Sequence, residues 1–415
     1  MLVTLCLGGK ERALAMRWIR WCLLPVLLWG SAEVALADIS IDGDYPGGNI
    51  VLEGIEGDVV YVRQDLRDTS GWWFYWNFSV RNAVGRHLKF HFTDRNVLGT
   101  RGPAVSRDGG QSWAWLGTKT VQEEQDGVSF THAFSAGEDA VRFAFSVPYQ
   151  ERDLLRFLRR HGDNDSLSVD TLCTSPQGRG VEQLRIGAPQ GEPRYRILLT
   201  ARHHCCESMA SYVLEGIMDT MLARGRHGRW FQKNVEALVI PFIDKDGVEA
   251  GDQGKNRQPR DHGRDYAGES IYPSTGALRA LAPDWSDGRL RIALDIHCPH
   301  IRGEYNEFVY LVGSADPEIW REEEVFSRRL ESVWRTGLPY RASNNLAFGE
   351  RWNTPNNYTA GQSMSAWAGE IPGVRLSASL EIPYANAGTR TVTPTRARRF
   401  GAALAKAMHA YLRNT

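Results

Sequence analysis

The chain has 415 residues, enough for two domains and at least one large core. Its 49 acidic and 49 basic residues cancel, which excludes a generally basic nucleic-acid binder and a polyanionic tail. The composition is otherwise that of an ordinary globular protein, with 42% hydrophobic and 24% charged residues, and no nucleic-acid partner is expected.

The N-terminus carries the pattern of an export signal. Arg17 and Arg20 precede a short apolar run at residues 21–29, and small residues suited to cleavage follow at 35–37. The apolar run is too short for a convincing membrane span, although an uncleaved anchor is the alternative. We expect residues 1–37 to be a signal peptide, with translation starting at Met1 or at Met16. The mature protein is then expected to be periplasmic or secreted, without a stable membrane span.

Residues 38–150 predict an all-β sandwich domain. Short alternating or aromatic runs at 49–52, 58–62 and 87–92 are separated by Gly, Asp and Asn, a spacing typical of sandwich strands. Alternate residues of the aromatic run at 72–78 are expected to fill the core of this sandwich and to cover the neighbouring domain, because aromatic side chains are usually buried. The alternative is an exposed surface on which sugar rings stack.

From residue 151 the pattern changes to alternating strands and helices, which indicates an α/β domain extending to residue 415. Buried strands are predicted at residues 196–200, 236–241, 291–296, 308–312 and 376–381. Helices are predicted from about 207 to 222 and from about 394 to 412.

Polar residues follow three of these strands at the point where each strand ends. His204 and Glu207 come just past the first strand, His297 follows the third, and Glu381 closes the fifth. Ligands collect at the carboxyl ends of strands in open α/β sheets, so these side chains are expected to meet. His204 and Glu207 are three residues apart at the start of a helix, which places them on one face.

Two imidazoles and a carboxylate leave a fourth position open for water, the arrangement that catalytic zinc requires. Glu381 is then the carboxylate that takes the proton of the attacking water. Three further histidines are rival ligands, namely His203, His262 and His300. The cysteines near these positions are expected to be small buried hydrophobes rather than ligands or a bridge, namely Cys205, Cys206 and Cys298.

In this set of motifs the sequence resembles the zinc carboxypeptidases of the pancreatic-carboxypeptidase type. Within that family its layout is similar to the cytosolic carboxypeptidases, which also carry an N-terminal β-sandwich. The resemblance implies a mixed-sheet catalytic domain with one zinc ion per chain and a peptide or peptide-like substrate. It implies that His204, Glu207 and His297 are the metal ligands and that Glu381 is the general base.

The resemblance also implies roles for the residues between the second and third strands. Arg260 is assigned the role of the arginine that polarises the scissile carbonyl, and Arg257 in the same segment is a candidate substrate contact. Asp261-His262-Gly263-Arg264 matches the family's Asp-x-Asn-Arg. Arg264 is then the anchor for a substrate C-terminal carboxylate, since a guanidinium binds a carboxylate through paired hydrogen bonds.

Three further positions complete the match. Asp261 is the expected carboxylate partner of a zinc histidine. Tyr358 resembles the mobile tyrosine that closes over substrate. Ser365 falls where digestive relatives place a specificity residue, and serine selects neither acidic nor basic side chains.

Gly263 departs from the family, because an asparagine that helps to bind the carboxylate usually stands there. Its loss removes two donors and one acceptor. Either Lys255 or Asn256 compensates, or the substrate is not held by a free C-terminus.

The sequence therefore predicts a zinc metallocarboxypeptidase that hydrolyses C-terminal peptide or isopeptide bonds. One alternative is a zinc amidohydrolase or deacylase of the aspartoacylase type, which shares the ligand pattern but lacks the sandwich and the tyrosine segment. The other is an exported glycan-binding scaffold with a decayed site.

Overall fold

The structure is a computed structural model that describes residues 38–93, 96–187 and 192–414. The predicted signal peptide at residues 1–37 lies outside the described residues. The described residues on both sides of residue 150 group into one compact unit. The predicted boundary between two domains at residue 150 therefore stays a prediction. Of the helices in the described ranges, none combines the length and the apolar character that crossing a membrane requires.

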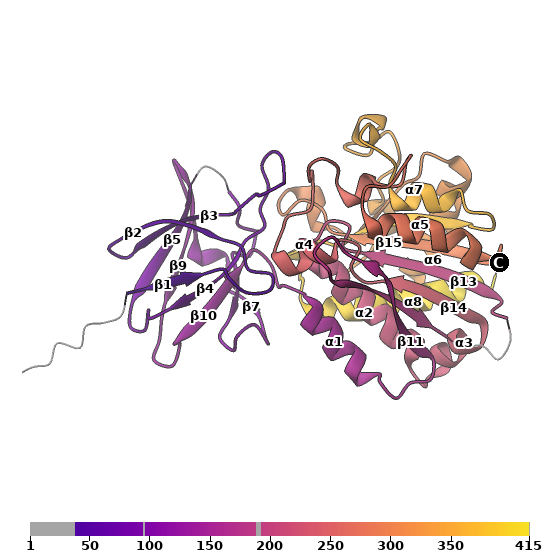
Figure 1. Cartoon of the computed structure of the whole chain (residues 1–415), viewed down its shortest axis with the longest axis horizontal. Coiled ribbons are helices and arrows are strands. Elements are labelled where there is room, and N and C mark those ends of the chain that lie inside the picture. Colours follow the sequence, from indigo (N-terminus) through magenta and orange to yellow (C-terminus); the bar gives the residue numbers. More distant parts are fainter. Residues whose placement is uncertain (1–37, 94–95, 188–191, 415) are drawn as a thin grey trace, which may run out of the picture. The chain divides into compact units, whose positions relative to one another are not determined.

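Two five-stranded sheets occupy the region between residues 40 and 144. The first has the order β1 (Ser40–Asp42), β4 (Asn77–Arg81), β10 (Ala140–Ala144), β6 (Ala104–Ser106) and β7 (Ala114–Trp115). The second has the order β2 (Val51–Glu56), β3 (Val59–Arg63), β5 (His87–Thr93), β9 (Gly127–Ala133) and β8 (Val121–Glu124). Figure 1 shows these strands in indigo and purple.

Aromatic side chains fill the space between these two sheets. Phe143 of β10 lies with its ring centroid 5.4 Å from that of Phe90 on β5 and 5.1 Å from that of Phe130 on β9. Phe74 and Trp76 of the aromatic run are fully buried. The expectation that this run fills a core therefore agrees with the structure, and these two rings offer no exposed surface for stacking sugars.

A seven-stranded mixed sheet follows in the chain. Its order is β11 (Leu167–Thr174), β12 (Gly180–Ile186), β14 (Val235–Ile240), β13 (Tyr195–Ala201), β15 (Leu290–His297), β17 (Leu376–Glu381) and β16 (Tyr310–Val312). The four neighbours β14, β13, β15 and β17 are parallel, whereas β11, β12 and β16 pair antiparallel. The predicted buried strands and the predicted mixed α/β class are confirmed.

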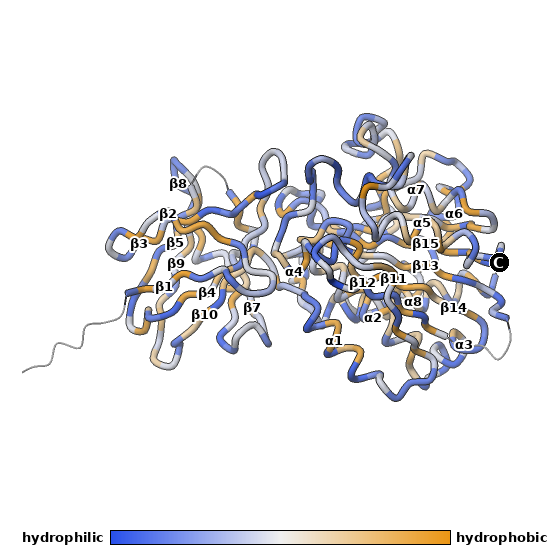
Figure 2. Tube along the Cα trace, in the orientation of Figure 1, coloured by the Kyte–Doolittle hydropathy of each residue, from blue (hydrophilic) through white to orange (hydrophobic). Residues whose placement is uncertain are grey.

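Helices cover both faces of this sheet. On one face Ile197 and Leu294 belong to the same core as residues of α2 (Ser208–Leu222), α6 (Pro317–Val333) and α8 (Pro394–Leu412). On the other face Leu198 and Ala293 pack with α5 (Pro273–Ser286) and α7 (Met364–Gly369). Because both faces are buried, the central strands are rich in apolar residues, as the orange stretches of β13 and β14 in Figure 2 show.

The remaining elements are short. The other helices are α1 (Glu151–Arg160), α3 (Arg226–Asn234) and α4 (Lys245–Ala250). Single 3₁₀ turns are η1 (Thr118–Thr120), η2 (His262–Arg264), η3 (Glu304–Glu307), η4 (Ala342–Asn344) and η5 (Pro355–Tyr358), and β18 (Asn386–Ala387) pairs with β19 (Arg390–Thr391).

Candidate metal centre and active site

The carboxyl ends of three parallel strands carry the predicted site residues. His297 ends β15 and Glu381 ends β17, and these two residues are direct partners in the parallel ladder. His204 and Glu207 lie in the loop that connects β13 to α2, and Glu207 is the residue immediately before the helix. The strand ends thus bring together the four side chains that the sequence predicted to meet.

The Glu207 carboxylate lies between two imidazoles. Its Oε1 is 2.9 Å from His204 Nδ1 and its Oε2 is 2.8 Å from His297 Nδ1. One donor atom from each of the three residues lies within 4.8 Å of the others, and all three groups are largely buried. Two imidazole nitrogens and one carboxylate are a donor set that suits zinc, so the residues fit the predicted ion.

The outer nitrogen of each imidazole faces a second carboxylate. His297 Nε2 lies 2.6 Å from Asp295 Oδ2, and His204 Nε2 lies 3.6 Å from Asp261 Oδ2. A carboxylate that faces Nε2–H favours the tautomer in which Nδ1 is unprotonated, so that its lone pair can bind a metal on the Glu207 side. Asp261 was predicted for such a role, whereas the contact made by Asp295 was not.

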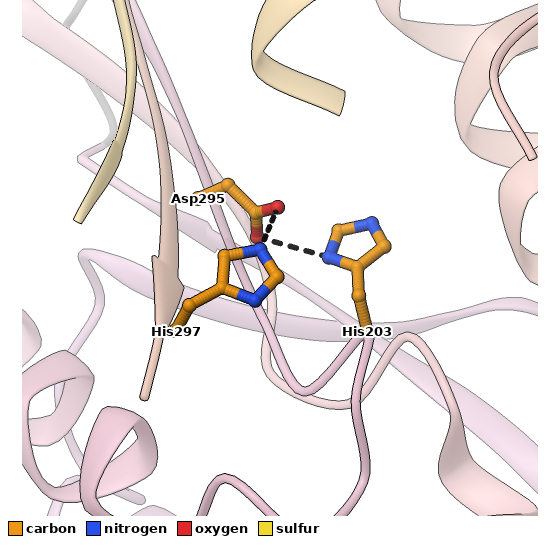
Figure 3. Close-up of side chains that lie close together, drawn as sticks. All are labelled: His203, Asp295 and His297. Carbon is orange, nitrogen blue, oxygen red and sulfur yellow. Dashed lines mark hydrogen bonds and ion pairs between the residues drawn. The ribbon is translucent and has the colours of Figure 1, made fainter. Parts of the chain in front are cut away.

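Asp295 also joins a rival cluster of possible ligands, which is drawn in Figure 3. Its Oδ1 lies 2.9 Å from His203 Nδ1, and His203 Nε2 lies 2.8 Å from the Tyr266 hydroxyl. Both nitrogens of His203 are therefore occupied, and its side chain is fully buried. His203 orients Asp295 and does not line the cavity described next.

The remaining rival histidines are held by aromatic rings, although His300 also lines the cavity described next. The His262 ring stacks on Tyr272 with a centroid distance of 3.6 Å, and burial lowers the pKa of His262 to about 4. The His300 ring packs against Trp72 at 5.2 Å. Neither belongs to a cluster of candidate metal ligands within the described part of the chain.

A cavity of about 1030 Å³ opens beside the His204, Glu207 and His297 cluster. Its lining includes two of the ligand candidates and four other polar groups with predicted or possible roles: His204, His297, Glu381, Lys255, Arg264 and Tyr358. The cavity is large enough for a ligand of several residues.

Glu381 contributes a carboxylate without a partner. Its Oε2 atom is buried and has no hydrogen-bond partner, and only 7% of the residue is exposed. Burial raises the pKa of Glu381, against the lowering effect of the nearby Lys255 ammonium. An unpaired carboxylate at this position is chemically suited to exchange protons with a molecule in the cavity.

Lys255 is the basic group beside the ligand cluster. Its Nζ lies 2.8 Å from Glu207 Oε1 and donates to the Cys298 carbonyl oxygen at 2.9 Å. From the sequence, Lys255 was expected only to compensate for the asparagine that Gly263 replaces. A buried ammonium at the wall of the cavity is also suited to stabilise negative charge that develops there.

The structure does not bring Arg260 or Arg257 into this cavity. Arg260 Nη1 pairs with Asp265 Oδ1 at 2.7 Å and donates to the Glu269 carbonyl. Arg257 is held by three carboxylates at 2.6–2.9 Å, those of Asp68, Asp244 and Asp252. Both guanidinium groups are therefore paired with protein carboxylates. The sequence motif gives the positions of the two arginines along the chain but not the direction in which their side chains point.

Arg264 and Tyr358 do line the cavity, as predicted for substrate contacts. The Arg264 guanidinium lies 5.1 Å from the centre of the Tyr358 ring, and the Tyr358 hydroxyl donates to Asn353 Oδ1 at 2.8 Å. Arg264 donates to the backbone oxygens of Asn357 and Gly263 and has no carboxylate partner among the described residues. It is free to bind an anionic group in the cavity.

Gly263 stands close to the His204 imidazole. A Cβ atom at this position would lie 3.1 Å from His204 Nε2 and 3.2 Å from Asp261 Oδ1. The glycine therefore packs closely against both His204 and Asp261, the carboxylate that faces His204 Nε2.

The cysteines near the site behave as small buried residues. Cys205, Cys206 and Cys298 are free and buried, and burial raises the pKa of each thiol. They are bound by protein groups, as when Cys206 Sγ accepts from Gln253 Nε2 at 3.0 Å.

Sequence comparison finds cytosolic carboxypeptidases among the relatives. Cytosolic carboxypeptidase 2 of Xenopus tropicalis is 24% identical over 263 residues, which cover 55% of this chain and 27% of that protein. Cytosolic carboxypeptidase 6 of Caenorhabditis elegans is 26% identical over 303 residues, which cover 63% of this chain and 65% of that protein. The chain thus spans about a quarter of the first of these relatives. No family model matches the sequence.

Solved structures share the fold over most of the chain. A metallo-carboxypeptidase from Burkholderia cenocepacia superposes with a TM-score of 0.74 at 19% identity, covering 91% of this chain and 99% of that one. A metallo-carboxypeptidase from Pseudomonas aeruginosa gives a TM-score of 0.72 at 18% identity, covering 90% and 99%. The predicted catalytic fold is confirmed by these neighbours.

The prediction of an exported protein is wrong on this comparison. The sequence relatives carry the name cytosolic carboxypeptidase, which contradicts a periplasmic or secreted location. The predicted family, in contrast, is confirmed, because relatives of one type recur in the sequence comparison and the fold neighbours are metallo-carboxypeptidases. The chain is thus similar in sequence to the cytosolic carboxypeptidases and shares its fold with metallo-carboxypeptidases, which supports the predicted family.

Proposed function

We propose that this protein is a zinc-dependent metallocarboxypeptidase that hydrolyses a C-terminal peptide or isopeptide bond. The observation that carries the proposal is a single cavity lined by His204 and His297 of the ligand cluster, by the unpaired Glu381 and by the free guanidinium of Arg264. His204, Glu207 and His297 would hold one zinc ion, which would supply Lewis acidity and make water a better nucleophile.

Glu381 is proposed to transfer the proton. The oxygen of water bonds to the scissile carbonyl carbon, and a water proton passes to the Glu381 carboxylate. As the carbon–nitrogen bond breaks, the proton moves to the departing amine, which leaves as a neutral amine. The buried Oε2 has no competing partner in the described structure, which supports this role.

Lys255 is proposed to stabilise the oxyanion in place of Arg260. Its ammonium lies beside the ligand cluster, whereas the Arg260 guanidinium pairs with Asp265 outside the cavity lining. A fixed positive charge in a largely buried site lowers the energy of a developing negative charge.

Arg264 and Tyr358 are proposed to hold the substrate terminus. Arg264 would bind the C-terminal carboxylate, and Tyr358 would donate to the substrate backbone once it leaves Asn353. Asp261 and Asp295 would orient His204 and His297. Residues 38–150 are proposed to be a separate β-sandwich domain whose two sheets share the aromatic core.

A zinc deacylase of the aspartoacylase type is the second candidate. Gly263 favours it, because the asparagine that helps to bind a free C-terminus is absent. A deacylase would cleave an acyl group from an amine without needing a free terminal carboxylate, which gives a direct way to separate the two functions.

The test compares peptides with free and with amidated C-termini, digested by zinc-loaded protein and followed by mass spectrometry. We expect stepwise loss of C-terminal residues from free peptides only. Glu381→Gln should abolish this loss, whereas Glu318→Gln, an exposed carboxylate on α6 outside the cavity, should behave as wild type. Equal cleavage of amidated peptides, or full activity of Glu381→Gln, would refute the proposal.

A further inference from the structure

Glu323 is a buried carboxylate in the wall of the cavity, contributed by α6. Its side chain is fully buried, and Oε2 accepts a hydrogen bond from the Ser314 backbone amide at 3.2 Å. Oε1 is buried and has no hydrogen-bond partner. Within residues 38–93, 96–187 and 192–414, no lysine, arginine or histidine forms an ion pair with it. A buried carboxylate is costly in this state unless it is protonated or meets a cation.

The strand β17 connects this carboxylate to the proposed reaction centre. Successive side chains of a strand alternate, so Ser377, Ser379 and Glu381 share the face that lines the cavity. Each two-residue step covers about 7 Å along the strand. Ser379 pairs with Val312, and Val312 lies two residues before Ser314, the partner of Glu323. Glu323 therefore lies near the part of the cavity about one step from Glu381.

The intervening wall is small and polar. Ser365 Oγ lies 2.9 Å from Ser379 Oγ, and Ser377 Oγ donates to the Ser365 carbonyl. Ile319, one helical turn before Glu323, adds an apolar patch to the lining. Small hydroxyl groups leave room for a long side chain, and the apolar patch suits an aliphatic stem that ends in a charge.

Positive and negative groups occupy different parts of the same cavity. Lys255 and Arg264 lie beside the ligand cluster and the Tyr358 segment, whereas Glu323 lies beside Ser314. A terminal residue with a carboxylate and a cationic side chain is complementary to both parts. A glutamate side chain would instead find no cation at Glu323, and its own charge would be left unpaired in a buried place.

We propose that Glu323 selects substrates whose C-terminal residue has a cationic side chain, a lysine-like amine or an arginine-like guanidinium. This inference rests on the proposed carboxypeptidase function and names the substrate class of that site. The cation would pair with Oε1, while Oε2 keeps its bond to Ser314. The specificity residue is then on α6 and not at Ser365.

The structural alternative is a protonated Glu323 that only supports the loop at Ser314. Burial raises the pKa of Glu323 well above its ordinary value, against the lowering effect of the Ser314 amide, so a proton is retained when no cation is present. A glutamine would keep the acceptor for Ser314 and lose only the negative charge. Glu323→Gln therefore separates the two roles.

The experiment measures kcat/KM of zinc-loaded protein on two peptides that differ only in a C-terminal lysine or norleucine. Wild type should prefer the lysine peptide by roughly 10- to 100-fold, the range expected for a charge-assisted hydrogen bond. Glu323→Gln should remove most of this preference by lowering lysine cleavage much more than norleucine cleavage. Glu318→Gln, on an exposed position of the same helix, should keep it.

Binding provides a second measurement that does not depend on turnover. Calorimetry with zinc-loaded Glu381→Gln should show tighter binding of N-acetyl-lysine than of N-acetyl-norleucine, and adding Glu323→Gln should equalise them. Equal cleavage and equal binding of the two side chains in wild type would overturn the inference, as would a preference for C-terminal glutamate. Equal loss of both activities in Glu323→Gln would assign it the structural role. If no peptide is cleaved, the proposed function fails, and the binding preference alone decides the role of Glu323.

Discussion

The Lys255 ammonium lies 2.8 Å from Glu207 Oε1, a carboxylate oxygen of the proposed zinc ligand. Glu207 is fully buried, yet its pKa is held well below the ordinary value: burial alone would raise it, and Lys255 and the two imidazoles lower it. The ligand carboxylate is therefore ionised and available to a metal ion. The same lysine lines the cavity.

Replacing Lys255 by methionine should lower kcat/KM by about 10²- to 10³-fold, the effect of removing one group that stabilises an oxyanion. Arg260→Met should stay within about threefold of wild type, because Arg260 pairs with Asp265 outside the cavity. Steady-state kinetics on one C-terminal peptide checks both. The opposite ranking would return the oxyanion role to Arg260.

Replacing Arg264 by glutamine should raise KM for peptides with a free C-terminus by about 10- to 100-fold, since a charged hydrogen-bond partner of the terminal carboxylate is lost. Binding of amidated peptides to the inactive Glu381→Gln protein should not change when Arg264→Gln is added to it. A KM unaffected by the substitution would mean that another group holds the terminus.

Asp295→Asn should weaken zinc binding by about 10- to 100-fold, because the partner of His297 Nε2 loses its charge. Asp261→Asn should weaken it less, since Asp261 Oδ2 is 3.6 Å from His204 Nε2 whereas Asp295 Oδ2 is 2.6 Å from His297 Nε2. Competition titrations with a chelating dye measure both affinities. Equal effects of the two substitutions would contradict this interpretation of the distances.

His262 should make the protein sensitive to acid. Burial, followed by the charges of Asp244 and Arg257 with opposite effects, lowers its pKa from 6.5 to about 4. The unfolded chain therefore binds the proton first as the pH falls, so the stability due to neutral His262 is full above pH 6.5 and is lost between pH 6.5 and 4. The loss amounts to about 3 kcal/mol.

Urea unfolding of metal-free protein across this range measures the effect. His262→Gln should flatten the dependence of the unfolding free energy on pH relative to wild type, whatever its effect at neutral pH. Parallel curves for the two proteins would show that His262 does not titrate in this way.

The ligand cluster was predictable from the sequence because its members end buried strands. Apolar runs ending in His297 and Glu381 place both at one edge of a parallel sheet, and the register of β15 and β17 makes them partners. Arg260 could not be placed in the same way. It lies in a loop between α4 and η2, where spacing along the chain gives no direction for the side chain.

Other contributors were missed because nothing local identifies them. In the sequence Asp295 is one polar residue within a buried strand, and only the structure shows that its carboxylate contacts His297 Nε2. Glu323 lies on α6, where a glutamate is expected to face solvent, and only the fold shows that it is buried beside Ser314 in the wall of the cavity. The predicted export is contradicted by the sequence relatives, which carry the name cytosolic carboxypeptidase, and not by any feature of the described residues.

The zinc content of purified variants, measured by inductively coupled plasma mass spectrometry, tests the proposed metal centre without relying on any substrate. We predict about one zinc per chain in wild type and in His203→Gln, whose imidazole faces Asp295 and Tyr266. We predict loss of the zinc in His204→Gln and in Glu207→Gln. Zinc retained in His204→Gln and lost in His203→Gln would place the ion in the rival cluster and contradict the proposed centre.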